Sequence, residues 1–149
     1  MPYSELRKGR YSGVGQIYFV TTTTHNREPT FNSFNIARTL INNMRLTQIK
    51  LDIIFLAWVI MPDHAHWLIQ LDGSNSLSKV INHLKGTSAR DINRLLNRKG
   101  KFWQSNYYDH GLRNDEDLMK IARYIVANPL RANLVKRIED YPHWDSIWI

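Results

Sequence analysis

Two histidines, His64 and His66, stand two residues apart in the most apolar part of the sequence. In a β-strand successive side chains point to opposite faces, so both imidazoles lie on one face and Ala65 points to the other. Neutral imidazole nitrogens bind divalent metals, and two rings that converge on one spot supply two of the ligands. A third ligand must come from another part of the chain. The alternative is that both rings are structural and fill half-buried strand positions with hydrogen-bonded partners.

A tyrosine later in the chain does not fit the core pattern of its helix. Tyr124 belongs to an amphipathic helical pattern whose apolar face consists of Leu118, Ile121, Ala122 and Ile125. On a helix of 3.6 residues per turn Tyr124 lies about 130° from the centre of that face, so core packing does not explain it. Asn128 follows one turn later, on the same side if the helix continues. Pro129 also predicts a short helix through Leu134, with Asn128 as its N-cap.

Two further residues are weaker candidates. Tyr141 could act as a nucleophile, but a proline follows it and it belongs to a C-terminal tail. His110 could serve as an additional acid, base or ligand, although a single histidine in a strand is more often structural.

The elements that must position these residues are a central hairpin and its neighbouring strands. Residues 53–70 contain two apolar runs separated by Met61-Pro62-Asp63, and this separator favours a turn between two strands. We expect the hairpin to be buried on both faces. An earlier strand is predicted at residues 17–24, and residues 101–113 are predicted to form a loop followed by a strand.

Three amphipathic helices accompany these strands. Capping residues predict helix starts at residues 32–33, 76–78 and 114, and the second helix runs to about residue 97. Acidic residues at 115–117 in the first turn of the third helix complement the helix dipole. The predicted core positions of the first helix are Ala37, Leu40, Ile41 and Met44.

Composition sets the outer limits. A chain of 149 residues, 43% of them apolar, fits one globular domain over residues 1–149, with an N-terminal arm at 1–12 and an aromatic tail at 141–149 that packs on the domain. The absence of cysteine excludes disulfides and thiolate chemistry. No apolar run approaches the roughly 20 residues of a membrane span, and the N-terminus lacks a signal-peptide pattern. The sequence therefore predicts a soluble, cytoplasmic protein.

The net charge of +7 favours a polyanionic partner. On the second helix the basic residues share one arc of the helical wheel, namely Lys79, His83, Arg90, Arg94 and Arg98. The opposite arc carries Leu77, Ile81, Leu84, Ile92 and Leu95. Such a stripe suits a phosphate backbone, and the alternative is a solvated basic face. Gly86, in the middle of this helix, costs about 1 kcal/mol relative to alanine, which indicates a bend or a close approach to its backbone.

Further basic and aromatic residues extend the candidate DNA surface. The N-terminal arm could contact phosphates, unless it is simply a frayed terminus. The aromatic residues of 101–113 could stack unpaired bases or pack the sheet edge. The candidate DNA contacts are Arg7, Lys8, Arg10, Lys79, Lys85, Arg90, Arg94, Arg113 and Arg131.

Four segments occur in an order that is typical of one protein family. They are WVIMPDHAH at 58–66, FWQ at 102–104, YDHGLR at 108–113 and YIVANPLRANLV at 124–135. Together they resemble single-tyrosine HUH transposases of the IS200-like superfamily, and most of all REP-associated tyrosine transposases. Two departures from the family pattern are the small Ala65 between the histidines and a Tyr-Pro-His-Trp tail in place of Tyr-Pro-Trp.

The resemblance implies an α+β fold of the ferredoxin-like βαββαβα type, with an antiparallel sheet and helices packed on it. It also implies that His64 and His66 bind a metal, that Asn128 helps complete the metal site, and that Tyr124 is the nucleophile. Phosphate oxygens and an amide ligand favour Mg²⁺ or Mn²⁺, while two imidazoles keep Zn²⁺ open.

The predicted function is a DNA-strand transferase that cleaves single-stranded or hairpin DNA through a 5′-phosphotyrosine and rejoins it. Its partner is DNA, with no small-molecule substrate and no membrane, and the chain acts as a monomer or a homodimer. Two alternatives remain open: a non-catalytic DNA-binding regulator and a metal-dependent nuclease that uses water.

Overall fold

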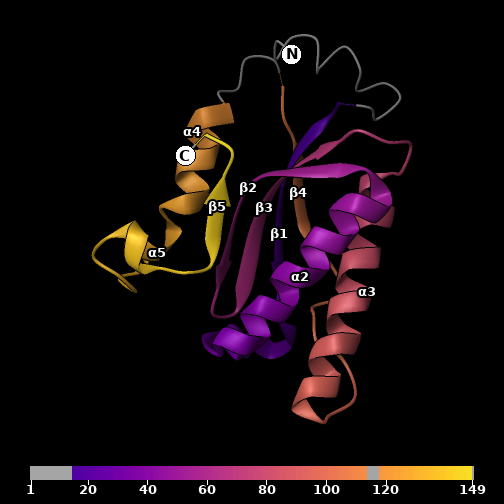
Figure 1. The fold of residues 1–149 in the computed structure, drawn as a ribbon, viewed down its shortest axis with the longest axis vertical. Coiled ribbons are helices and arrows are strands. Elements are labelled where there is room, and N and C mark those ends of the chain that lie inside the picture. The colour runs from indigo at the N-terminus through magenta and orange to yellow at the C-terminus, as the bar shows by residue number, and fades with distance from the viewer. Residues whose placement is uncertain (1–14, 114–117, 149) are drawn as a thin grey trace.

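The computed structural model describes residues 15–113 and 118–148. Its main elements follow the order β1, α2, β2, β3, α3, β4, α4, α5, β5, and three short 3-10 helices lie at His25–Arg27, Thr30–Asn32 and Ile138–Asp140 (Figure 1). The predicted basic arm at residues 1–12 and the predicted acidic helix start at 114–117 lie outside the described residues. No helix within the described ranges combines the length and apolar character that a membrane crossing requires.

Five strands form one antiparallel sheet in the order β4-β1-β3-β2-β5. Their bounds are Ile17–Thr23 for β1, Ile53–Met61 for β2, His64–Leu71 for β3, Tyr108–Gly111 for β4 and Trp144–Ser146 for β5. The predicted α+β order and the predicted strands at 17–24, 53–70 and 101–113 are confirmed. The C-terminal strand β5 was not predicted, because three residues are too few for an alternating pattern.

The β2–β3 hairpin forms the centre of the sheet, and Pro62 and Asp63 lie in its turn. The register shifts between Phe55 and Ala57, which places a bulge in β2. An inserted residue reverses the side-chain alternation beyond it. Beyond the bulge, Val59 pairs with His66 and Met61 pairs with His64.

The helices begin at the capping residues that the sequence indicates. α2 covers Phe34–Leu51, and the Ser33 hydroxyl accepts a hydrogen bond from the Ile36 amide. α3 covers Leu77–Leu96, and the Ser76 hydroxyl accepts one from the Lys79 amide. α4 covers Leu118–Val126 and α5 covers Asn128–Arg131.

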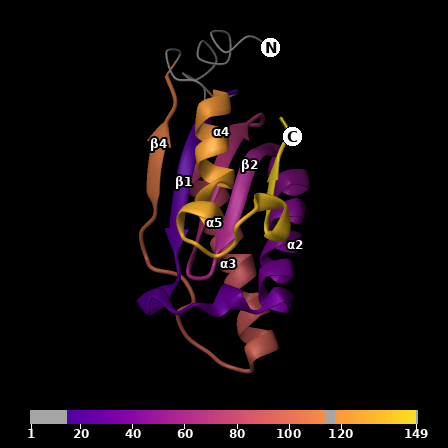
Figure 2. The same ribbon diagram turned by 90° about the vertical axis from the view of Figure 1, so that its left-hand side faces the viewer.

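The sheet has two differently covered faces, which we name by the helices that pack on them. α2 and α3 cover the α2/α3 face, and α4 lies against the other, the α4 face (Figures 1 and 2). The core of the α2/α3 face includes Trp67, Ile81 and Leu84, each with 0% exposure. The core of the α4 face includes Leu68 and Ile125, also with 0% exposure. The hairpin is therefore covered on both faces, as predicted.

Two expectations about α3 need revision. Leu95 was expected in the core but is 60% exposed, because the last turn of α3 extends beyond the end of the sheet (Figure 1). At Gly86 the helix runs on unbroken, and an added Cβ would meet no described atom within 4 Å. Within the described chain, neither a break in the helix nor a close backbone contact accounts for this glycine.

The aromatic tail packs on the domain, as expected. β5 pairs with β2 along the sheet edge, and Trp144 and Trp148 pack against the core of the α4 face. This packing explains why the tail adds a strand instead of trailing from the domain.

Candidate active site

His64 and His66 lie on the α4 face at the start of β3, and their ring centroids are 4.8 Å apart. They share this face with Leu68, which belongs to the α4-face core, while Ala65 belongs to the opposite core. The predicted convergence of the two imidazoles is therefore present. Both residues are half-buried.

Each imidazole has its Nδ1 atom engaged by a different partner. Nδ1 of His64 lies 2.7 Å from Oδ1 of Asp63, and Nδ1 of His66 lies 2.7 Å from Oγ1 of Thr21. An ionised carboxylate only accepts hydrogen bonds, so Nδ1 of His64 donates and Nε2 keeps its lone pair. The Thr21 hydroxyl can accept from Nδ1 of His66 in the same way. This is the arrangement by which outer partners orient metal-binding histidines.

Asp63 is itself held in place by a second partner. The Arg27 side chain donates from Nε to Oδ2 of Asp63 over 3.1 Å. Burial on its own would raise the pKa of Asp63, but the hydrogen bond from His64 and the positive charges of His64 and Arg27 lower it below its usual value. Asp63 therefore stays ionised over the pH range in which His64 would bind a metal.

The surroundings of His66 favour its neutral form. Burial, followed by the positive charges of His64 and Arg131, lowers the pKa of His66 to about 3. A neutral imidazole keeps a nitrogen lone pair for coordination.

Tyr124 lies on α4, across an aromatic ring from the histidine pair. Its side chain is 54% exposed, as the helical pattern predicted for a residue outside the core face. The Phe19 ring centroid lies 6.5 Å from that of Tyr124 and 5.5 Å from that of His66. The guanidinium carbon of Arg131 lies 4.0 Å from the centroid of the Tyr124 ring. Phe19 thus connects the candidate nucleophile to the histidines, and Arg131 covers the tyrosine.

Asn128 lies at the start of α5, and the prediction that it forms the N-cap was wrong. Ala127 occupies the cap with helical backbone angles (φ −80°, ψ −2°), and Asn128 is the first helical residue. The helix also ends at Arg131, earlier than the predicted Leu134. A turn at Ala127 joins α4 to α5, so the chain stays helical up to the proline. The Asn128 amide is consequently not used for capping.

The donor set fits a metal that is completed by an amide or by a substrate oxygen. Two neutral imidazoles and an amide oxygen are suitable ligands for a divalent ion. Among residues 15–113 and 118–148, no group of three His, Cys, Asp or Glu side chains is placed to bind a metal. The described residues of these four types therefore supply two ligands, His64 and His66, and no third.

The two weaker candidates occupy different surroundings. The Tyr141 hydroxyl donates to the carbonyl oxygen of Ile60 over 2.5 Å, and burial raises the pKa of Tyr141 to about 12. Both features oppose a role as nucleophile. His110 pairs with Phe19 in the β1–β4 register, so it shares the α4 face but lies on the strand beyond the site.

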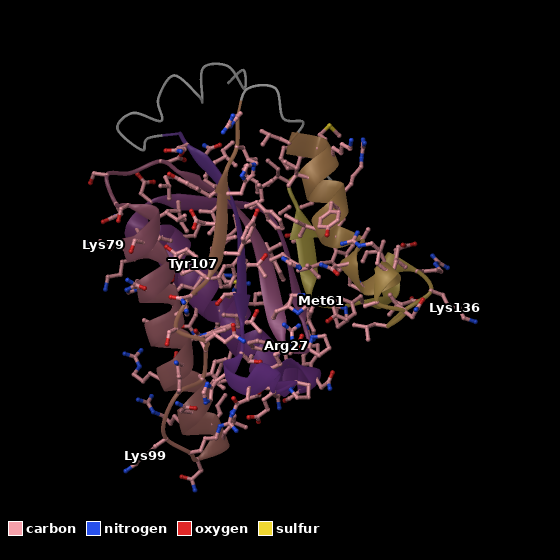
Figure 3. The ribbon with its side chains drawn as sticks, turned by 180° about the vertical axis from the view of Figure 1, so that it is seen from behind. Arg27, Met61, Lys79, Lys99, Tyr107 and Lys136 are labelled. Atoms are coloured by element: carbon pink, nitrogen blue, oxygen red, sulfur yellow. The ribbon has the colours of Figure 1, made fainter. Side chains whose placement is uncertain are left out.

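The predicted DNA contacts fall into three groups. Arg7, Lys8 and Arg10 lie outside the described residues. Lys79, Lys85, Arg90 and Arg94 lie on α3, which packs on the face opposite the histidines. In Figure 3 the labelled Lys79 lies in the first turn of α3 and Lys99 lies just beyond its last residue, whereas Met61 and Arg27 mark the site. Arg113 is exposed just after β4, and Arg131 lies at Tyr124.

Two α3 residues already have partners within the protein. Nζ of Lys85 donates to the carbonyl oxygen of Gln104 over 2.6 Å, and Nε of Arg90 lies 3.3 Å from Oδ1 of Asp91. Their roles as DNA contacts stay predictions.

The sequence did not reveal four residues that shape the site, namely Asp63, Thr21, Phe19 and Arg27. Asp63 was interpreted only as a turn residue, although a carboxylate directly before a candidate ligand is a recognisable signal. Thr21 and Phe19 reach the site through strand pairing between β1 and β3, which local patterns do not give.

Comparison with known proteins places most of the chain in one family. The family model described as "Transposase IS200 like" matches residues 14–128. The matched segment contains both histidines and Tyr124 and ends at Asn128.

Two curated relatives match part of the chain. A protein named as a REP-associated tyrosine transposase in Haemophilus influenzae is 31% identical over 94 residues, which cover 56% of this chain and 53% of that protein. The REP-associated tyrosine transposase of Escherichia coli K12 is 29% identical over 87 residues, which cover 58% of this chain and 50% of that protein. The match thus spans about half the length of these relatives.

Two solved structures share the fold. The structure of a REP-associated tyrosine transposase bound to a REP hairpin superposes with a TM-score of 0.75, at 24% identity over 91% of this chain and 79% of that one. A crystal structure described as a transposase from Deinococcus radiodurans gives a TM-score of 0.57, at 21% identity over 73% of this chain and 87% of that one. At these identities the likeness concerns the fold.

Proposed function

The chain belongs to the IS200-like transposase family, and we propose that it is a DNA-strand transferase that cleaves single-stranded DNA through Tyr124 and rejoins it. One observation carries the proposal: two imidazoles with engaged Nδ1 atoms lie on the α4 face beside a phenylalanine that also contacts the exposed Tyr124. We propose hairpin-containing DNA as the substrate, because a relative with this fold is bound to a REP hairpin.

His64 and His66 are the proposed metal ligands through Nε2, and the Asn128 amide oxygen is the proposed third. Mg²⁺ or Mn²⁺ bound there would stabilise the negative charge that develops on the phosphate oxygens. Asp63 and Thr21 act one step further out, since they hold the two rings in the tautomer that leaves Nε2 free.

The proposed reaction is an exchange of one phosphoester bond for another. The Tyr124 oxygen loses its proton and attacks the phosphorus, while the bond from phosphorus to the 3′ oxygen breaks and that oxygen takes up a proton. The products are a 5′-phosphotyrosine and a free 3′-hydroxyl. Because the phosphoester bond is retained, a 3′-hydroxyl from another strand can reverse the step without a nucleotide cofactor.

Arg131 is the proposed anchor for the reacting phosphate. Its guanidinium covers the Tyr124 ring, and its charge acts on His66, so it is near both the nucleophile and one of the histidines. A guanidinium can form two parallel hydrogen bonds with a phosphate and so fix its orientation.

The test is covalent capture of hairpin oligonucleotides in the presence of Mn²⁺, scored on a denaturing gel. We expect Tyr124→Phe to abolish the protein–DNA adduct while DNA affinity changes by no more than about threefold, because only one hydroxyl is lost. Tyr141→Phe is the matched control and retains the adduct. An undiminished adduct in Tyr124→Phe would move the nucleophile elsewhere.

The same assay separates the two other functions. A wild-type protein that binds hairpins but yields neither adduct nor cleavage would be a DNA-binding regulator. Cleavage that survives in Tyr124→Phe without any adduct would indicate a nuclease that uses water.

A further inference from the structure

An exposed aromatic pair lies on the α4 face next to the candidate active site. Tyr108, the first residue of β4, is 58% exposed, and the half-buried Phe19 of β1 lies beside it with a ring-centroid distance of 6.2 Å. We propose that Tyr108, whose ring Phe19 supports edge to face, stacks an unpaired DNA base next to the phosphate held at Tyr124; the two residues are together called the aromatic platform. This inference rests on the proposed function and adds a base-binding subsite to it.

Strand register places Tyr108 in line with the histidine pair. Thr21 of β1 pairs with His66 on one side and with Tyr108 on the other. Directly paired residues of an antiparallel sheet share a face, so His66, Thr21 and Tyr108 form one row across three strands. Two strand spacings amount to about 10 Å. A base on Tyr108 would therefore belong to a nucleotide near the one that carries the reacting phosphate.

Phe19 contacts both Tyr108 and Tyr124, so the three rings form a continuous aromatic row. Phe19 meets Tyr108 edge to face at 74° and meets Tyr124 edge to face at 84°. Both tyrosines are more than half exposed. Edge-to-face contacts fix the orientation of the tyrosine rings while their remaining surface stays open to a ligand. Within the described chain β4 is the edge strand of the sheet, so no further strand covers Tyr108.

Charge near the platform favours a nucleic acid strand over a second copy of the chain. Arg131 lies over the Tyr124 ring at the end of this aromatic row. A copy of a chain with net charge +7 would bring more positive charge to that place, whereas a DNA strand brings phosphates. Single-stranded nucleic acids bind where cationic side chains follow the backbone and aromatic rings stack the bases.

The neighbouring tyrosine provides a contrast within the same strand region. Tyr107 packs against the core of the α2/α3 face, and its ring lies 5.8 Å from Nζ of Lys85. Two adjacent tyrosines therefore point to opposite faces, and only Tyr108 lies on the face of the histidines. Tyr107 supplies a matched control at a distance of one residue.

The experiment compares two probes of equal charge by fluorescence anisotropy in EDTA, which prevents cleavage. One probe is an oligothymidylate of about twelve nucleotides, and the other has the same backbone with abasic nucleotides. We expect Tyr108→Ala to weaken oligothymidylate binding about tenfold and to leave abasic binding within twofold. Tyr108→Phe should restore the affinity, because it restores the ring, and Tyr107→Ala should not discriminate between the probes. Circular dichroism verifies that each variant is folded.

Several outcomes would overturn the platform. They are an unchanged affinity for oligothymidylate, an equal loss on both probes, or a change in self-association in place of DNA binding. The adduct assay with wild type and Tyr124→Phe is read separately. If Tyr108→Ala weakens binding as expected but wild type forms no adduct, the base-binding subsite is supported and the strand-transfer function is not. If wild type forms the adduct but Tyr108→Ala binds both probes normally, the strand-transfer function is supported and the subsite is not.

Discussion

The two faces of the sheet differ in how their side chains are covered. On the α2/α3 face two long helices pack on the sheet, and Trp67 of β3 and Leu84 of α3 are fully buried between them. On the α4 face a helix of nine residues covers an apolar patch, and His64, His66 and Tyr124 lie beside it with part of their surfaces exposed. Both faces therefore contain a buried core, but the partly exposed candidate site residues lie only on the α4 face.

The largest effect should come from the α2/α3 face. Leu84→Ala removes a fully buried side chain from the core of that face, and we expect it to lower the free energy of unfolding by about 2–5 kcal/mol. Tyr124→Ala, on a side chain that is 54% exposed, should cost less than about 1 kcal/mol. Urea unfolding monitored by tryptophan fluorescence measures both. If the two variants were equally destabilised, Tyr124 would contribute to the packed core of the α4 face and would not be an exposed side chain beside it.

A loss of metal affinity with little loss of stability is expected from Asp63→Ala. The change removes the carboxylate that fixes the tautomer of His64, and outer partners of this kind contribute roughly 10–100-fold to metal affinity. Mn²⁺ binding measured by calorimetry checks this without any activity assay.

Arg27→Ala is the control with a smaller expected effect. The Arg27 side chain is 62% exposed, so its ion pair with Asp63 should contribute less to Mn²⁺ affinity than the Asp63 carboxylate does. Equal Mn²⁺ affinity in wild type and Asp63→Ala would contradict the orienting role.

The sequence allowed the main features of both faces to be predicted, because they follow from local periodicity. Alternation in a strand places His64 and His66 together, and a helical wheel leaves Tyr124 outside the core. The expectation that Leu95 is buried was wrong, because periodicity identifies the apolar side of a helix but not the point where the sheet beneath it ends. The prediction that Asn128 caps the short helix was wrong, because Ala127 has helical backbone angles and occupies the cap position instead.

The remaining parts of the site depend on distant pairings. Thr21 reaches His66 across 45 positions of sequence, and Phe19 connects His66 with Tyr124 only through the packing of α4. To predict these contacts one must know which residue of β1 pairs with which residue of β3. That register depends on the β2–β3 hairpin with its bulge and on the rest of the sheet. The metal and the roles of the basic residues of α3 stay predictions.

A smaller effect separates a structural tyrosine from the proposed nucleophile. Tyr141→Phe removes the hydrogen bond to the Ile60 carbonyl oxygen and should lower the free energy of unfolding by about 1 kcal/mol at neutral pH. Burial raises the pKa of Tyr141 from 10.0 to about 12, so between these values the folded state binds more protons than the unfolded state. Wild-type stability therefore falls as pH rises through this window.

In Tyr141→Phe that contribution is absent, so the stability advantage of the wild type should shrink above about pH 10 and change sign before about pH 12, because a pKa difference this large outweighs the roughly 1 kcal/mol of one hydrogen bond. Urea titrations at several alkaline pH values measure it. A difference that stays constant across the window would mean that the Tyr141 phenol is not protected by the fold.

The smallest effect tests whether the basic side of α3 has a function of its own. Gly86 is exposed in the middle of an unbroken helix, and a Cβ there would meet no described atom within 4 Å. Gly86→Ala should therefore stabilise the protein by up to about 1 kcal/mol, because alanine loses less backbone entropy in a helix. Paired measurements of unfolding and of hairpin affinity give two separate answers. A gain in stability with unchanged affinity would assign α3 to the stable side of the sheet alone, since nothing approaches its backbone there. The same gain with weaker hairpin binding would mean that DNA lies against the helix at Gly86 and that both faces contact the substrate.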